Sequence, residues 1–158
     1  MAKKYWLVKS EPNAFSIDDL AKSKNKTTYW DGVRNYQARN FMRDDMKKGD
    51  YVLFYHSNAN PTAVVGVCEV VKEGYPDFTA FDPEAKHFDP KSKEDKPTWM
   101  MVDLKLLKKF NKIVTLAEIK ENGKLQNMKL VQRGNRLSVM PVAKKEFDII
   151  LKMGETKL

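Results

Sequence analysis

The chain has 158 residues, of which 42% are hydrophobic and 32% charged, and a formal net charge of +8 at pH 7. This composition excludes a disordered chain, and the lack of an apolar run near the ~20 residues that cross a bilayer excludes a membrane-spanning protein. The single cysteine, Cys68, excludes an internal disulfide. A single cysteine suits a reducing compartment, and the first residues contain no apolar stretch of the length found in signal peptides. We therefore expect a cytoplasmic protein, associated with the nucleoid in a bacterium or located in the nucleus in a eukaryote.

Hydrophobic spacing and capping residues predict short elements of both types. In chain order they are a strand over 5–9, a helix over 16–22, a helix over 35–47, strands over 50–57 and 63–71, a strand over 98–107, a short helix from Thr115, a helical turn over 125–131, a strand over 136–142 and a helix over 143–153. Ser16 with Asp19 and Thr115 with Glu118 are spaced as capping boxes. Gly49 is expected to end the helix over 35–47.

Residues 72–97 contain four prolines and little periodicity, so we expect an ordered excursion or flap there. A loop of this length inside a compact domain is usually functional or mobile. Short strands separated by short helices predict an α+β fold, a small mixed β-barrel with short flanking helices. No linker or repeat divides the chain, which is therefore expected to be a single domain over 1–158.

The charge is distributed unevenly along the chain. Residues 105–136 contain nine basic and two acidic side chains, whereas acidic residues outnumber basic ones seven to five over 72–97. A basic face beside a neutral flank is typical of a protein that binds a polyanion. The alternative is a lysine-rich surface that only keeps the protein in solution.

Motifs for catalysis or metal binding are scarce. The histidines are His56 and His87, and one cysteine gives no zinc set of the usual spacing. No phosphate-binding loop and no dinucleotide-binding glycine motif is present. Ser10 beside Glu11, and the run Tyr55 to Ser57, contain acid–base groups, but their spacing does not require a triad. We expect no catalytic residue, no metal and no cofactor.

Residues 29–57 (YWDGVRNYQARNFMRDDMKKGDYVLFYHS) combine aromatic, arginine and amide side chains densely. Such residues stack on bases, bond base edges and neutralise phosphates. Together with WLVKSEP, VVGVCEVV and RLSV, this stretch resembles the EVE domain, which includes the thymocyte nuclear protein family and belongs to the PUA-like superfamily of small β-barrels. The resemblance implies a non-catalytic reader of nucleic acid that holds a flipped or modified base at the barrel mouth, and the base implied is a modified cytosine in DNA. We also expect a monomer that does not bind membranes.

The resemblance and the residue chemistry together give a candidate base pocket. Its residues are Ser10, Glu11, Trp30, Asn35, Tyr55, His56 and Ser57. Trp30 is expected to stack on the base, and the carboxylate of Glu11 to accept from an exocyclic amine. The alternatives are a core tryptophan, a surface ion pair for Glu11 and a helix cap for Asn35.

A second group of basic residues is expected to hold backbone phosphates. Its members are Lys9, Arg34, Arg39, Arg43 and Arg136. Arg34 or Arg136 could instead be structural, paired with Asp31 or Asp50. Two alternatives to the reader remain: a small hydrolase of a modified nucleoside or base, using Lys9 and Glu11, and a general RNA-binding module.

Overall fold

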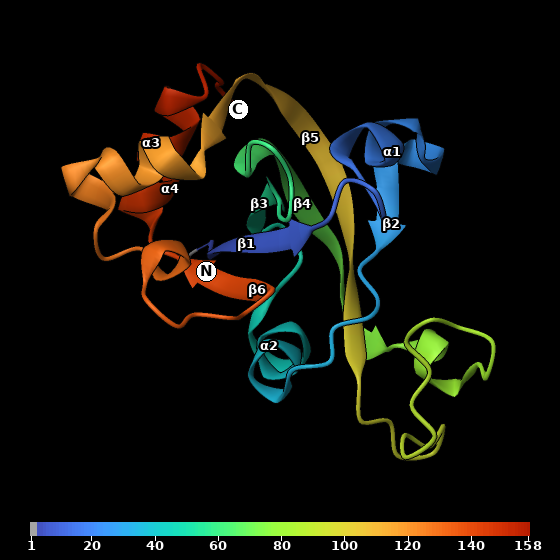
Figure 1. The fold of residues 1–158 in the computed structure, drawn as a ribbon. Coiled ribbons are helices and arrows are strands. Elements are labelled where there is room, and N and C mark those ends of the chain that lie inside the picture. The colour runs from blue at the N-terminus through green and yellow to red at the C-terminus, as the bar shows by residue number, and fades with distance from the viewer. Residues whose placement is uncertain (1–2) are drawn as a thin grey trace.

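The computed structural model describes residues 3–158, and six strands form one sheet at its centre (Figure 1). The strands are β1 (Tyr5–Ser10), β2 (Thr27–Tyr29), β3 (Tyr51–His56), β4 (Ala63–Pro76), β5 (Met100–Thr115) and β6 (Val139–Val142). Their order is β2-β5-β4-β3-β1-β6, with β1 and β3 parallel and the other neighbours antiparallel. The expected α+β class is confirmed. The sheet is open rather than a closed barrel, because no ladder among residues 3–158 joins the edge strands β2 and β6.

Short helices cover both faces of the sheet (Figure 1). They are α1 (Ile17–Lys22), α2 (Tyr36–Asn40), α3 (Leu116–Glu121) and α4 (Lys144–Met153), with a π-helical turn over Phe41–Asp45 and 3₁₀ turns over Lys24–Lys26, Phe78–Phe81, Gly123–Leu125 and Lys129–Val131. The capping boxes expected at Ser16 and Thr115 are both present. In the part of the chain described, no helix has the length and apolarity to span a bilayer.

Alternation along the central strands divides the core into two clusters. In β1, Trp6 and Val8 belong to a cluster with Trp30, whereas Leu7 between them packs into a second cluster with Phe147 of α4. This follows from the strand period of two, which sends successive side chains to opposite faces. The first cluster includes residues of α1 and α2, and the second includes residues of α3 and α4. The face of the sheet on which a strand residue lies therefore decides which of the two clusters it joins.

Several expected boundaries are wrong. The helix over 35–47 ends as α2 at Asn40 and continues as a π-helical turn, and Gly49 lies beyond it, in the turn before β3. β2 was not expected, since three residues are too few to show periodicity. β4 runs on to Pro76, where it still pairs with β5, and Gly74 lets its backbone approach the π-helical turn. A β-carbon at position 74 would lie 2.6 Å from the carbonyl oxygen of Met42.

Candidate functional site: a pocket beside Trp30

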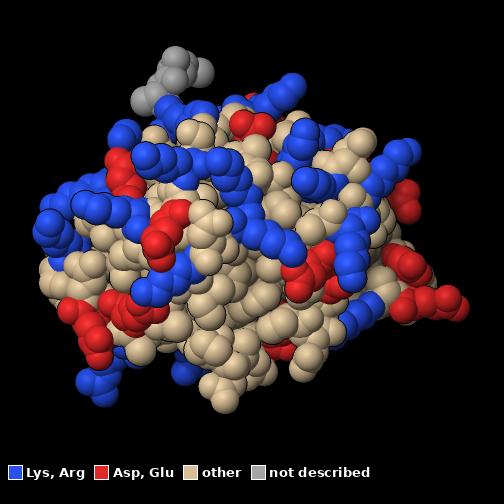
Figure 2. Space-filling model, turned by 90° about the horizontal axis from the view of Figure 1, so that it is seen from above, with Lys and Arg blue, Asp and Glu red and all other residues tan. Residues whose placement is uncertain are grey.

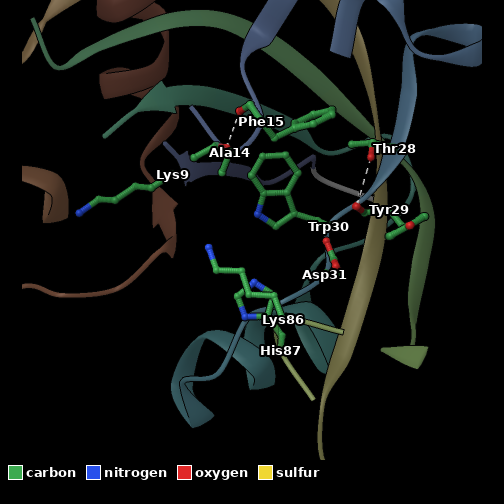
Figure 3. Close-up of a pocket in the computed structure, with 10 residues that line it drawn as sticks. Lys9, Ala14, Phe15, Thr28, Tyr29, Trp30, Asp31, Lys86 and His87 are labelled. Atoms are coloured by element: carbon green, nitrogen blue, oxygen red, sulfur yellow. Dashed lines mark hydrogen bonds between the residues drawn. The ribbon is translucent and has the colours of Figure 1, made fainter. Parts of the chain in front are cut away.

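A cavity of about 470 Å³ opens beside Trp30 (Figure 3). Its walls come from the end of β1, the loop before α1, the segment from β2 to Asp31, and the long segment between β4 and β5. The lining residues are Lys9, Ser10, Ala14, Phe15, Thr28, Tyr29, Trp30, Asp31, Lys86 and His87. Three separate parts of the chain, residues 9–15, 28–31 and 86–87, thus meet at one concave surface.

Trp30 is fixed in orientation by both its backbone and its ring. Its backbone N–H donates to the carbonyl of Val102 at 2.8 Å, which continues the pairing of β2 with β5. The ring meets Phe15 and Phe54 edge-on, with centroid distances of 6.4 and 5.4 Å. Only 8% of the residue is exposed, yet it lines the cavity. Trp30 is therefore both a core residue and a preorganised wall.

The long segment, residues 77–99, is tied to the pocket by Asp77. Its fully buried carboxylate accepts from the backbone N–H of Gly32 at 2.8 Å and from Nη1 of Arg34 at 3.0 Å. It also accepts from the backbone N–H of Thr79 at 2.9 Å. Burial alone would raise the pKa of Asp77, but the bonds from Thr79, Gly32 and Arg34 outweigh it and lower the pKa below its ordinary value. The carboxylate is thus stabilised in its charged form.

Gly32 and Arg34 also fix His87. The Arg34 guanidinium donates to the His87 carbonyl from Nη2 at 2.6 Å and from Nε at 3.1 Å. Gly32 has φ of +79°, and a β-carbon there would lie 2.5 Å from Cδ2 of the imidazole. The ring therefore packs directly on the glycine backbone. In Figure 3, His87 and Lys86 approach Trp30 from the side opposite Phe15.

The polar groups of the pocket have perturbed environments. Burial raises the pKa of Asp31, and the neighbouring Asp77 raises it further, against smaller lowering effects of its own backbone N–H, His87 and Arg34. Burial lowers the pKa of Lys9. The Ser10 hydroxyl donates to the carbonyl of Phe15 at 2.5 Å. Perturbed titratable groups in a concave site are typical of binding sites.

Of the seven residues expected in the base pocket, the structure brings Ser10 and Trp30 to the cavity. Glu11 is exposed, and its carboxylate accepts from Nδ2 of Asn58 at 3.5 Å. Asn35 is the N-cap of α2 and accepts from the backbone N–H of Ala38 at 3.0 Å, which is the alternative considered for it. Neither Glu11 nor Asn35 lines the cavity.

The end of β3 lies behind the pocket rather than in it. Tyr55 is buried in the cluster on the α3–α4 face, because Phe54 before it already faces Trp30. Nε2 of His56 accepts from the backbone N–H of Ile17 at 3.1 Å, and burial lowers the pKa of this histidine despite the opposing effect of Asp18. The Ser57 N–H donates to the Ser10 carbonyl at 3.0 Å. These residues support the loop after β1.

The expected phosphate-binding residues have different surroundings. Lys9 lines the pocket, but its ammonium lies 5.9 Å from the Tyr55 ring centre and extends away from Trp30 (Figure 3). Arg34 is structural, paired with Asp77 and not with Asp31 or Asp50. Arg39 donates to the Thr98 carbonyl at 2.8 Å.

The last two arginines are on the surface. Arg43 forms two bonds to exposed Asp44, from Nε and Nη2, both at 2.9 Å. Arg136 is exposed, and Asp50 is occupied by Nε1 of Trp6 at 3.0 Å and not by Arg136. The face seen from above in Figure 2 has a broad band of Lys and Arg with acidic side chains interspersed. Basic side chains thus form a broad surface on this face of the molecule.

Five polar or charged residues that line the cavity were not among the expected site residues: Thr28, Tyr29, Asp31, Lys86 and His87. Asp31 directly follows Trp30 in the sequence, and this position alone indicates that it could lie near the pocket. Lys86 and His87 belong to the proline-rich excursion, where no periodicity indicates which side chains turn inward. Their position depends on long-range contacts, namely the bonds from Arg34 to the His87 carbonyl and the packing of the His87 ring on Gly32.

The EVE domain family matches residues 4–153 of this chain. The chain belongs to the EVE domain family. It is 44% identical to thymocyte nuclear protein 1 of Homo sapiens over 96% of this chain and 74% of that protein. The expected family is thereby confirmed.

Solved structures of similar proteins have the same fold. A hypothetical protein from Leishmania major is 52% identical, with a TM-score of 0.91, and the match covers 98% of this chain and 96% of that one. The crystal structure of human THYN1 protein in complex with 5-methylcytosine containing DNA is 43% identical, with a TM-score of 0.90. That match covers 99% of this chain and 100% of the other.

Proposed function

We propose that this chain is a non-catalytic DNA reader that accepts a flipped, modified cytosine in the pocket beside Trp30. The observation that carries the proposal is a relative of the same fold, 43% identical over almost the whole chain, in complex with 5-methylcytosine containing DNA. The geometry of the pocket supports the same function. We also infer a PUA-like architecture for the open sheet and a single domain over 1–158.

The pocket has the size and the walls that an extruded base requires. Its volume of about 470 Å³ lies within the ~300–1,000 Å³ usual for small-molecule sites. Trp30 offers a fixed indole, and the His87 ring lines the same cavity from another segment. Stacking on an aromatic ring contributes roughly 1–3 kcal/mol per base, comparable with the few kcal/mol needed to flip it.

The phosphates flanking the base require positive groups around the pocket. Lys86 lines the cavity, and Lys9 lies at its rim with its ammonium directed outward. Neither ammonium forms an ion pair with another residue in the part of the chain described. The basic surface in Figure 2 adds a general attraction between the protein and the DNA backbone.

Reading rather than catalysis is the better fit to the residues present. The alternative hydrolase paired Lys9 with Glu11, but Glu11 is exposed and outside the cavity lining, so the two groups do not converge on a common space. A base for catalysis has to reach the reacting proton at about 2.6–3.2 Å or through one water. Asp31 and His87 also line the cavity, and in a reader they contact the base without taking part in a reaction.

A binding assay with matched DNA duplexes tests the proposal. Fluorescence anisotropy compares duplexes that carry one 5-methylcytosine, one cytosine or one uracil at the same position, at fixed salt. We expect the 5-methylcytosine duplex to bind most tightly and to be recovered unchanged by mass spectrometry. Equal affinity for all three duplexes would contradict a reader. Release of an altered base or nucleoside would replace it with the hydrolase, and tighter binding to single-stranded RNA would favour the RNA-binding module.

A further inference from the structure

Asp31 is the only acidic residue among the ten that line the pocket. Its position is set by the chain, since it directly follows Trp30 and precedes Gly32, whose N–H is bonded to Asp77. In Figure 3 its carboxyl group lies at the side of the gap that separates Trp30 from Lys86 and His87. A base held in that gap would present an edge toward Asp31.

The carboxyl group of Asp31 is available to a ligand. Within residues 3–158 it has no side-chain hydrogen-bond partner and no ion pair, and the only bond acting on it comes from its own backbone N–H. The pocket wall removes water from it, and burial is the largest cause of its raised pKa. A partly desolvated carboxylate with few donors gains more from a new N–H donor than one that is already bonded. Asp77 nearby has four donors and no such capacity.

The chemistry of an ionised carboxylate limits which base edge it can bind. It only accepts hydrogen bonds, and the 4-amino group of cytosine is a donor, whereas thymine has a carbonyl oxygen at the same position. 5-Methylcytosine and thymine have the same ring and the same methyl group. The pocket can therefore distinguish them only through the edge.

We propose that Asp31 is the specificity-determining residue of the pocket, which accepts a hydrogen bond from the 4-amino group of an extruded cytosine-class base and rejects thymine. This inference rests on the proposed reader function and deepens it. It assigns the edge to a residue on the cavity wall in place of Glu11, which is exposed and outside the lining. The other charged groups near Asp31 serve other contacts: Arg34 is paired with Asp77, and Lys86 offers donors only.

The test compares 5-methylcytosine with thymine in otherwise identical duplexes. Each base is placed opposite an abasic site, so that no base pair has to be broken when it leaves the stack. The wild type and the variants Asp31→Asn, Asp31→Ala, Glu11→Gln and Asp148→Asn are compared by anisotropy after a thermal melt has shown that each is folded. Asp148 is exposed on α4, where its partner is Lys144, so Asp148→Asn removes one negative charge away from the pocket.

We expect the wild type and Asp148→Asn to prefer 5-methylcytosine by about tenfold, the range of one good base contact. Asp31→Asn should lose or reverse this preference, because its amide can donate to the thymine carbonyl. Asp31→Ala should lose affinity for 5-methylcytosine without gaining thymine. If Asp31→Asn and Asp31→Ala keep the wild-type preference, or if Glu11→Gln alone removes it, Asp31 is not the edge reader, although the reader function stands. A folded wild type that binds neither base above the background of an unmodified duplex overturns the reader function and this inference together.

Discussion

Nη1 of Arg34 lies 3.0 Å from Oδ2 of Asp77, and this ion pair joins the loop before α2 to the segment that follows β4. The aspartate is fully buried, while 22% of the arginine side chain is exposed. The same guanidinium donates twice to the carbonyl of His87, ten residues farther along. Arg34 therefore holds both Asp77, the first residue of the 77–99 segment, and His87, which this segment contributes to the pocket.

Replacing Asp77 with alanine should lower the free energy of unfolding by about 3–5 kcal/mol, the cost of leaving one member of a buried pair alone. The folded-state pKa of Asp77 is lowered, so its stabilisation is present above the ordinary aspartate pKa of about 3.9 and is lost as pH falls through the folded value. Urea unfolding at pH 7 and at acid pH measures the difference. Asp44→Ala, which breaks an exposed pair, should leave stability unchanged. An equal loss in both variants would contradict the role of Asp77.

Gly32 and Gly134 form a natural pair for testing the contact with His87. Both have positive φ, +79° and +80°, so alanine is strained at either position by about 1–2 kcal/mol. A β-carbon at Gly134 meets nothing within 4 Å, whereas one at Gly32 meets the imidazole of His87 at 2.5 Å. Gly32→Ala should therefore be less stable than Gly134→Ala and should weaken DNA binding, which Gly134→Ala should not. Thermal melts and anisotropy measure both effects, and equal behaviour would show that His87 adapts freely.

The sequence allowed the family, the mixed fold and the capping boxes to be predicted, because these depend on local patterns. Ser16 and Thr115 cap their helices through contacts three residues away. Trp30 and Ser10 were also anticipated at the pocket, from aromatic character and the turn after the first strand. Each of these features depends on residues that are close together in the sequence.

The remainder of the site depends on long-range geometry that no pattern encodes. We expected Tyr55 beside Trp30, but Phe54 occupies that position, and Tyr55 lies on the opposite face of the sheet. A shift of one residue along a strand is enough to exchange the two faces. His87 reaches the pocket through bonds to Arg34, 53 positions away. The arginine row was expected to face phosphates, but Arg34 is tied to a buried aspartate that periodicity could not pair with it.

Asp31→Asn should stabilise the free protein at neutral pH. The pKa of Asp31 is raised in the folded state, so folding favours its protonated form. Stability from this group is fully present below the ordinary value near 3.9 and is lost as pH rises through the raised folded pKa. An amide avoids that loss, so the gain of the variant should appear at pH 7 and vanish near pH 3. Melting temperatures of both proteins across this range measure it, with Asp148→Asn as the control; destabilisation at pH 7 would indicate a structural carboxylate.

The salt dependence of binding should identify the basic residues that contact phosphates. Lys86 has no ion pair among residues 3–158, whereas Arg43 is already paired with Asp44. Lys86→Ala should therefore reduce the slope of log affinity against log salt by about one unit, and Arg43→Ala by less. Anisotropy titrations at several salt concentrations measure both slopes. A larger change for Arg43→Ala would show that its ion pair opens on DNA and that the row expected from the sequence contacts the backbone.

Trp30→Phe should weaken binding to every base, since a smaller ring keeps some stacking but loses part of the roughly 1–3 kcal/mol that an aromatic wall contributes. Trp30 is also a core residue, with Phe54 against its ring, so stability should fall as well. Trp6→Phe is the matched control, because Trp6 is buried in the same cluster, bonded to Asp50, and absent from the cavity lining. Both variants should melt at lower temperature, but below their transitions only Trp30→Phe should lose affinity, equally for 5-methylcytosine and thymine. If the two variants bind DNA alike, the indole of Trp30 serves packing alone and the base lies elsewhere.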